Sequence, residues 1–214
     1  MGPIVVLGAH DATVDVDVER LRADFNRKHY LRLPGLIAPE LLERVLNAVD
    51  VAEFDVELSD TFFLDHSISP DASPVPLLHL LVNCEPLFRF VGAVTGCPRV
   101  RSFSGRVFRI VAGSPDHLEW HRDLDHDRFV ALSLSLARTP CVGGALSLRR
   151  TGTEDSVSIA NPRAGDAVLF RVDPRFEHRV EPVLSGPPRV AFSGWFSPRP
   201  FSDALRQRAA GDPG

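Results

Sequence analysis

The sequence predicts an α+β protein in which helices from the first half support a β-sandwich or barrel formed by the second half. Apolar residues recur at helical spacing in three segments before residue 96. From Val100 onward the pattern changes to short strand-like segments separated by turn residues. Helices therefore come first and a block of strands follows, which is the order typical of this class.

Residues 1–14 are expected to be a leader or a first edge strand around 4–7, and the pattern becomes helical from Val16. Val18, Leu21 and Phe25 lie on one face of that helix. An alternating strand at 30–37 contains Pro-Gly, and a second helix begins with a proline near its first turn. A third helix is expected over 77–95, because Gly96 and Pro98 would end it there.

Residues 51–76 are rich in Asp, Ser and Pro, and they predict a loop with one short strand around 61–64. Long loops in compact domains often serve as lids or binding loops. We hypothesise that this segment is a mobile cover over the mouth of the barrel, with Phe62, Phe63 and Leu64 as its apolar contact. The alternative is that these three residues form an ordinary edge strand.

The second half predicts about eight strands. They are expected at 103–112, 118–123, 128–137, 144–149, 155–159, 166–171, 178–184 and 188–196. Gly143-Gly144 is interpreted as a tight connection between strands, since no helix follows that could bind phosphate.

Composition narrows the class of protein. We expect one domain over 1–214, with helical support and the cover loop in 1–99, the strand core in 100–197 and a tail at 198–214. A net charge of −4 argues against a nucleic-acid partner, and no apolar run has the length of a membrane span. Three cysteines without CxxC spacing fit a cytoplasmic protein better than a disulfide framework. A monomer or homodimer is expected.

The residues that stand out chemically are His121 and Asp123, two positions apart, and His178 in a later strand. Alternate residues of an extended segment point to the same side, and a rolled sheet can bring the two strands together. Two histidines and one carboxylate are the facial triad that holds non-haem Fe(II) with open positions. His117-x-Glu119 has the same spacing and remains a rival pair.

The second half resembles the iron(II)/2-oxoglutarate-dependent dioxygenases, most closely their prolyl-hydroxylase-like branch. The resemblance lies in the order and spacing of several segments, which are His121-Arg-Asp123, 128–136, 143–146, 162–170, 178–183 and 189–196. It implies a double-stranded β-helix, a jelly-roll or cupin-like barrel, with N-terminal supporting helices. It also implies Fe(II), with 2-oxoglutarate and O2 as co-substrates.

The resemblance assigns expected roles to further residues. Arg189 would bind the far carboxylate of 2-oxoglutarate, since a guanidinium offers two parallel donors. Strand alternation puts Ser193 and Trp195 on the same face as Arg189, so the hydroxyl of Ser193 is expected to bind the same carboxylate of 2-oxoglutarate. Many relatives use a tyrosine here that this chain lacks, and Ser135 is expected to help complete the pocket instead. The residues expected to contact substrate are Trp195, Arg109, Arg106 and Phe63.

The resulting expectation is a biosynthetic hydroxylase that oxidises an unactivated C–H bond of an amino acid, a peptide or a biosynthetic intermediate. 2-Oxoglutarate would be converted to succinate in the same reaction. Desaturation or ring closure by the same site, hydrolysis with Zn(II) in the same ligands, and a non-catalytic binding barrel are the alternatives. Fold alone does not choose the substrate.

Overall fold

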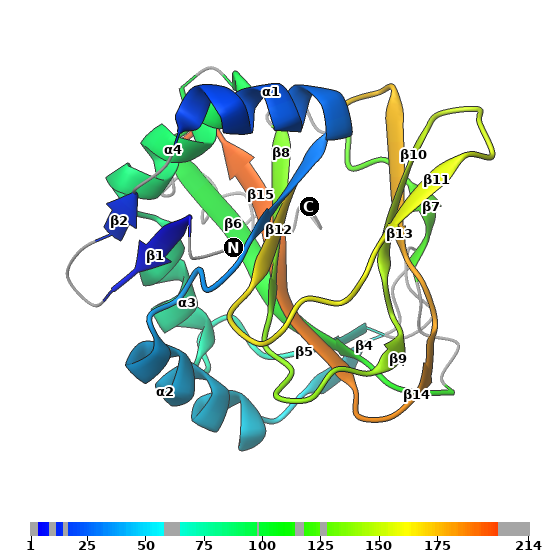
Figure 1. The fold of residues 1–214 in the computed structure, drawn as a ribbon. Coiled ribbons are helices and arrows are strands. Elements are labelled where there is room, and N and C mark those ends of the chain that lie inside the picture. The colour runs from blue at the N-terminus through cyan, green and yellow to red at the C-terminus, as the bar shows by residue number, and fades with distance from the viewer. Residues whose placement is uncertain are drawn as a thin grey trace.

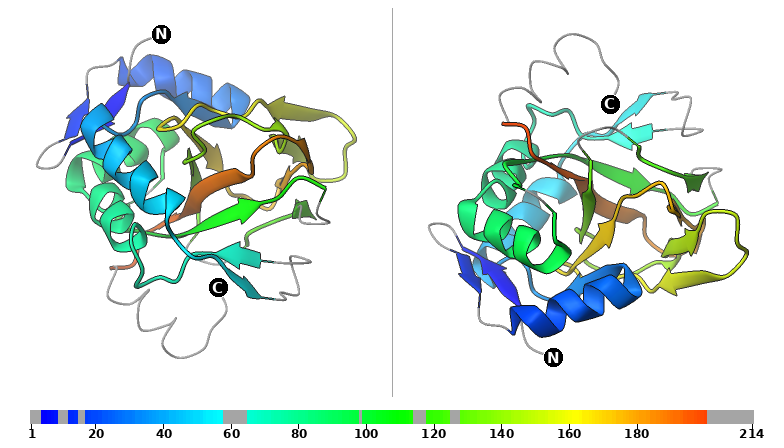
Figure 2. Two further views of the ribbon diagram at one scale, coloured as in Figure 1. Left: turned by 90° about the horizontal axis from the view of Figure 1, so that it is seen from below. Right: turned by 90° about the horizontal axis from the view of Figure 1, so that it is seen from above.

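The structure is a computed structural model that describes residues 4–8, 12–14, 17–57, 65–97, 99–113, 118–124 and 128–200. A seven-stranded sheet forms its centre, with helices on one side and a four-stranded sheet on the other (Figures 1 and 2). This arrangement confirms the predicted α+β class, with a double-stranded β-helix and supporting N-terminal helices.

The described residues form four α-helices, α1 (Val18–Lys28), α2 (Pro39–Asp50), α3 (Val75–Val82) and α4 (Glu85–Thr95). The side chain of Asp17 accepts a hydrogen bond from the backbone N–H of Arg20 and begins α1, as expected of an N-cap. His29 ends the same helix in the left-handed conformation, at φ 66°. Leu21 and Phe25 are the buried face that the sequence pattern predicted.

The expected third helix over 77–95 is instead two helices, α3 and α4, with a bend of 62° between them. The physical reason lies at Asn83, which ends α3. Its side-chain amide donates to the carbonyl oxygens of His79 and Phe103, and its Oδ1 accepts from the N–H of Phe103. Pro86 lies in the first turn of α4, where a proline is well tolerated. Among the described residues no single helix is long and apolar enough to cross a membrane, although this bent pair meets that length and composition jointly.

The central sheet has the order β3-β12-β8-β15-β6-β5-β4 and the smaller sheet the order β11-β10-β13-β7. The bounds of these strands are β3 Tyr30–Leu33, β4 Asp55–Glu57, β5 Asp65–Ser67, β6 Ser102–Ile110, β7 Leu118–His121, β8 Val130–Ser135, β10 Leu146–Arg150, β11 Ser156–Ile159, β12 Ala167–Arg171, β13 Phe176–Val180 and β15 Arg189–Ser197. Two short pairs complete the fold, β1 (Val5–Leu7) with β2 (Ala12–Val14) and β9 (Val142–Gly143) with β14 (Val183–Ser185).

The strand predictions agree with the structure in position but miss two subdivisions. The segment expected at 178–184 is divided into β13 and β14, and a separate short strand, β9, lies just before the segment expected at 144–149. The loop expected over 51–76 contains β4 and β5, which extend the central sheet beyond β6. Residues 61–64, including Phe62, Phe63 and Leu64, lie outside the described residues, so the cover remains a hypothesis.

The buried apolar residues form two clusters, one on each side of the central sheet. The larger cluster joins the helices to the sheet and includes Phe25, Phe103, Phe192 and Phe196. The second lies between the two sheets and includes Phe108, Leu148, Phe170 and Ala191. Because residues alternate between faces along each strand, β15 contributes Phe192 and Phe196 to one cluster and Ala191 to the other.

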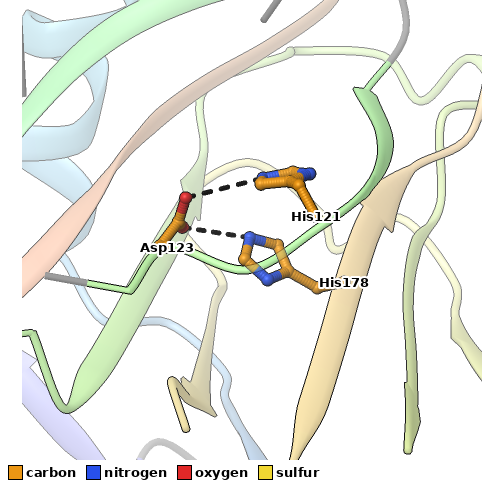
Figure 3. A group of neighbouring side chains, drawn as sticks. All are labelled: His121, Asp123 and His178. Atoms are coloured by element: carbon orange, nitrogen blue, oxygen red, sulfur yellow. Dashed lines mark ion pairs between the residues drawn. The ribbon is translucent and has the colours of Figure 1, made fainter. Parts of the chain in front are cut away.

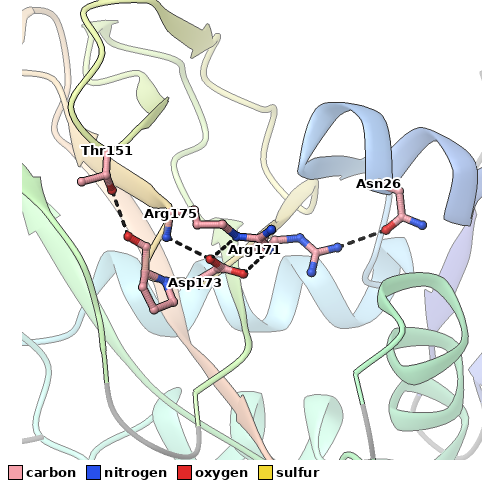
Figure 4. Close-up of polar contacts among 6 residues, drawn as sticks. Asn26, Thr151, Arg171, Asp173 and Arg175 are labelled. Atoms are coloured by element: carbon pink, nitrogen blue, oxygen red, sulfur yellow. Dashed lines mark hydrogen bonds and ion pairs between the residues drawn. The ribbon is translucent and has the colours of Figure 1, made fainter.

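A polar network holds the turn between β12 and β13, the turn that leads into His178 (Figure 4). The carboxylate of Asp173 accepts from the N–H, Nε and Nη2 of Arg175 at 2.9, 2.8 and 2.6 Å. Arg171 donates to Asn26 of α1 at 3.1 Å, and Thr151 donates to the carbonyl oxygen of Pro174. The hydrogen bonds from Arg175 lower the pKa of Asp173 to about 2.

Replacing Asp173 with Asn should lower the free energy of unfolding at pH 7 by up to about 1 kcal/mol, the range of a surface ion pair. The pKa of Asp173 is lowered by folding from 3.8, so its stabilisation is present above pH 4 and is lost as the pH falls toward 2. Urea unfolding from pH 7 downward should therefore show the difference between wild type and variant shrinking below pH 4. The exposed Asp155→Asn is the control, and an equal effect there would contradict the assignment.

Candidate active site

The pairing of β13 with β7 brings the two candidate histidine ligands together. His178 and His121 are Cα partners across the two strands, and their ring centroids are 4.2 Å apart. Asp123 follows two residues after the end of β7. The prediction that these two strands lie side by side is confirmed.

The carboxylate of Asp123 faces both imidazoles, as Figure 3 shows. Its Oδ2 is 3.1 Å from His178 Nε2 and its Oδ1 is 3.6 Å from His121 Nε2. One ligand atom from each of the three residues lies within 4.8 Å of the others. Two nitrogens and one oxygen converging in this way suit a transition-metal ion with positions left open.

A backbone contact and burial determine the protonation state of His121. The Nδ1 of His121 lies 2.6 Å from the carbonyl oxygen of Glu119. A carbonyl only accepts, so Nδ1 carries the proton in this contact and Nε2 keeps its lone pair toward Asp123. Burial, with a further contribution from His178, lowers the pKa of His121, which favours the neutral ring that a metal requires.

The electrostatic environment of Asp123 favours its ionised form. Burial would raise the pKa of this carboxyl group, but the hydrogen bond and charge of His178, the charge of His121 and the hydrogen bond of Trp195 outweigh it. The pKa falls to about 2, so Asp123 is a carboxylate at neutral pH. The rival Glu119 is exposed and contributes a backbone carbonyl to this cluster.

A floor of small side chains separates the triad from Arg189. The paired register of β8 and β15 places Ala131 beside Trp195, Ser133 beside Ser193 and Ser135 beside Ala191. The floor is therefore Ala131, Ser133, Ser135, Ala191 and Ser193. Larger residues border it, with Phe170 and Val168 on β12 and Phe108 on β6.

Arg189 begins β15 at the end of this floor away from Trp195. Its side chain is buried, its Nη2 donates to Ser133 Oγ at 3.2 Å, and its Cζ lies 5.4 Å from the ring of Phe108. Within the described part of the chain, Nη1 has no hydrogen-bond partner and no carboxylate forms an ion pair with Arg189. Burial lowers its pKa to about 10, so the guanidinium is still charged at neutral pH.

A buried cation without an anionic partner is costly to a fold and is a strong indication of an anionic ligand. A cavity of about 20 Å³ borders Arg189 and is lined also by Ser133, Ser135, Cys141 and Asn161. The cavity is about the size of one water molecule, and it marks a polar space beside the unpaired end of the guanidinium.

The structure brings some of the other predicted residues to this site and places one of them, Arg109, away from it. Ser193 donates to Ser133 Oγ at 2.8 Å, and Ser135 lines the cavity. Arg106 is the Cα partner of Ser193, which puts it on the same face of the sheet. Arg109 falls on the opposite face and stacks on Phe54 at 4.4 Å, so it does not join this site. Phe63 lies outside the described residues.

Two features of the site were missed by sequence reasoning. Ser133 joins Arg189 to Ser193, and its presence two residues before Ser135 in an apolar strand was the available signal. The indole of Trp195 donates to Asp123, a contact between residues 72 positions apart that no sequence pattern indicates.

Comparison with known proteins agrees with this geometry. Residues 106–197 match the family model described as the 2OG-Fe(II) oxygenase superfamily. A comparison with curated protein sequences finds no match.

Solved structures with a similar fold include a Pseudomonas putida prolyl-4-hydroxylase, at 21% identity over 86% of this chain and 100% of that one, with a TM-score of 0.63. A Trichoplax adhaerens prolyl hydroxylase, solved with a hypoxia inducible factor peptide fragment, has 19% identity over 84% and 88% of the two chains and a TM-score of 0.63. The non-heme alpha ketoglutarate dependent epimerase SnoN, from nogalamycin biosynthesis, has 16% identity over 84% and 82%, with a TM-score of 0.64.

The fold and the matched segment define an oxidoreductase of the class that uses Fe(II), 2-oxoglutarate and O2. Residues 106–197 carry the match, and the resemblance to the 2OG-Fe(II) oxygenase superfamily, and to its prolyl-hydroxylase-like branch, is confirmed.

Replacing Asp123 with Ala should weaken Fe(II) binding strongly, because the charged ligand that faces the two histidines is removed. Anaerobic competition with a coloured Fe(II) chelator measures the affinity. Glu119→Ala, from the rival pair, is the matched control and should bind Fe(II) as the wild type does. The reverse pattern, with loss in Glu119→Ala only, would move the ligand set to the rival pair.

Proposed function

We propose that this protein is a hydroxylase that inserts oxygen into an unactivated C–H bond of an amino acid, a peptide or a biosynthetic intermediate. His121, Asp123 and His178 would hold Fe(II), and Arg189 would hold the far carboxylate of 2-oxoglutarate. The observation that carries this proposal is the buried, unpaired guanidinium of Arg189 at the end of a small-residue floor that leads to the triad.

The residues present fit the metal. Both histidines direct Nε2 toward the carboxylate, and the tautomer of His121 is fixed by the carbonyl of Glu119. Three protein ligands leave further coordination positions for other molecules. Fe(II) with 2-oxoglutarate and O2 supplies an oxidant strong enough for C–H bonds, as 2-oxoglutarate is converted to succinate and CO2.

The residues also fit the co-substrate. Arg189 Nη1 is available for a carboxylate oxygen, and a charge-assisted contact of this kind is stronger than a neutral one. The hydroxyl groups of Ser133 and Ser193 form a connected pair at the same level of the sheet. This pair and Ser135 would take the place of the tyrosine that many relatives use. The burial of Arg189 excludes water, which strengthens its attraction for the anion.

The substrate itself would approach the triad from the side of Trp195 and Arg106. Both lie on the face of the central sheet that carries the floor, Trp195 beside Asp123 and Arg106 beside Ser193. Two of the similar structures are prolyl hydroxylases and one is an epimerase, which supports a small-molecule or peptide substrate without choosing between them.

The reaction can be identified with a metabolite extract. Protein loaded anaerobically with Fe(II) and 2-oxoglutarate is mixed with the extract, ¹⁸O-labelled O2 is admitted, and the products are compared by mass spectrometry. Hydroxylation predicts a compound that gains one labelled oxygen atom. Loss of two hydrogens without label would instead mean desaturation or ring closure, and the absence of succinate under all conditions would contradict the proposal.

Arg189→Ala should raise the dissociation constant for 2-oxoglutarate about 10- to 150-fold, which corresponds to about 1.5–3 kcal/mol for a charged hydrogen bond. Fe(II) affinity should stay close to that of the wild type. Arg189→Lys should recover part of the loss, because a point charge cannot reproduce the two parallel donors. Calorimetric titration measures both affinities. Arg109→Ala, on the other face of the sheet, is the matched control, and unchanged 2-oxoglutarate binding in Arg189→Ala would rule out the assignment.

Ala191→Phe should block 2-oxoglutarate while sparing the metal, because the new ring would fill the floor. Ala191 is 1% exposed and lies between Ser135 and Phe108 on neighbouring strands. The expected result is at least a 100-fold loss of 2-oxoglutarate affinity with Fe(II) binding retained in the same sample. Ala191→Val is a smaller change that tests the trend if the larger one disturbs folding. Normal 2-oxoglutarate binding in both variants would show that the ligand lies elsewhere.

A further inference from the structure

Trp195 makes a direct contact with the candidate metal ligand Asp123. Its indole Nε1 donates a hydrogen bond to Asp123 Oδ2 at 2.7 Å. An indole N–H can only donate, so a lone pair of that oxygen is committed to the contact. The same oxygen lies 3.1 Å from His178 Nε2, whereas the other oxygen faces His121 Nε2 at 3.6 Å.

Three neighbours determine where the indole lies. Ala131 and Ser104, the Cα partners of Trp195 on β8 and β6, are small and leave the large ring room above the sheet. The guanidinium carbon of Arg128 lies 4.0 Å from the ring centre, in the geometry of a cation–π contact. Arg128 therefore helps to fix the plane of the ring, and with it the direction of the N–H group.

The orientation of a ligand carboxylate has a chemical consequence. A free carboxylate can bind a metal through one oxygen or through both. Binding through both would use one of the positions that the keto acid and O2 require. A donor fixed on one oxygen orients the carboxylate and favours binding through a single oxygen.

We propose that Trp195 is a positioning residue for the metal ligand Asp123, with Arg128 holding the indole in place. This inference rests on the proposed function, because it takes Asp123 as a ligand of Fe(II). It assigns Trp195 a role distinct from contact with substrate. Trp195 acts through Asp123 and sets both the affinity for Fe(II) and the number of coordination positions that the protein leaves open on the metal.

The most direct experiment removes only the N–H group. The chain has two tryptophans, Trp120 and Trp195, so each can be replaced singly by benzothienylalanine, which has sulfur in place of the indole N–H and nearly the same shape. Trp120 is a matched control because it also stacks on arginine, at 4.2 Å from Arg149 and 4.7 Å from Arg179, and lies beside His121. Trp195→Phe is a second variant without the donor.

Two readouts are used with each protein under anaerobic conditions. The first is Fe(II) affinity by competition with a chelator, and the second is the visible absorption of the Co(II) form, which reports coordination number. Replacement at 195 should weaken Fe(II) binding about 10- to 100-fold and change the Co(II) spectrum. Replacement at 120 should leave affinity within about two-fold and the spectrum unchanged. Arg128→Gln should give a smaller loss than either change at 195.

The results separate this inference from the proposed function. Unchanged Fe(II) affinity and an unchanged Co(II) spectrum in both variants at position 195 would overturn the positioning role. Equal losses of Fe(II) affinity at positions 120 and 195 would also overturn it, because they would indicate a general disturbance of the barrel. If Asp123→Ala binds Fe(II) as the wild type does, the proposed ligand set fails instead, whatever the variants at 195 show.

Discussion

The antiparallel pairing of β13 with β7 is the constraint on which the candidate site depends. It sets His178 directly opposite His121, so that Asp123, two residues further along, can turn one carboxylate oxygen toward each ring. The register shifts between His178 and Val180, directly after the histidine pair. Contacts distant from the triad support the position of β13. The Asp173–Arg175 turn leads into this strand, and Arg171 joins the turn to α1.

The second constraint is the burial of a positive charge. Arg189 is enclosed between the two sheets with a serine hydroxyl as its hydrogen-bond partner among the described residues. A ligand would offset that cost, and the small residues of β8 and β15 lie between Arg189 and the triad. The candidate metal ligands and Arg189 are thus positioned by different pairings, β7 with β13 and β8 with β15, and can be tested independently.

Much of the fold could be predicted because strand alternation and helix periodicity are local signals. The candidate triad could be predicted because His121 and Asp123 are only two positions apart and His178 lies in a segment with a clear strand pattern. The break at Asn83 could not, since it depends on hydrogen bonds to Phe103 in a strand that comes later in the chain. The Trp195–Asp123 contact and the Arg189–Ser133 contact likewise join distant residues. Arg106 and Arg109 both lie on β6, but they point to opposite faces of the sheet, and Arg109 points away from the site. A shift of one residue along a strand changes the face to which a side chain points, and the sequence pattern did not fix β6 that closely.

The central claim is that one Fe(II) ion and one 2-oxoglutarate molecule occupy the space between the triad and Arg189. A crystal structure from crystals grown and soaked anaerobically with both, with anomalous data at the iron edge, tests it most directly. We expect a single iron peak bounded by His121, Asp123 and His178, and a keto acid whose far carboxylate contacts Arg189 Nη1. An iron peak elsewhere, or a keto acid that does not reach Arg189, would contradict the account.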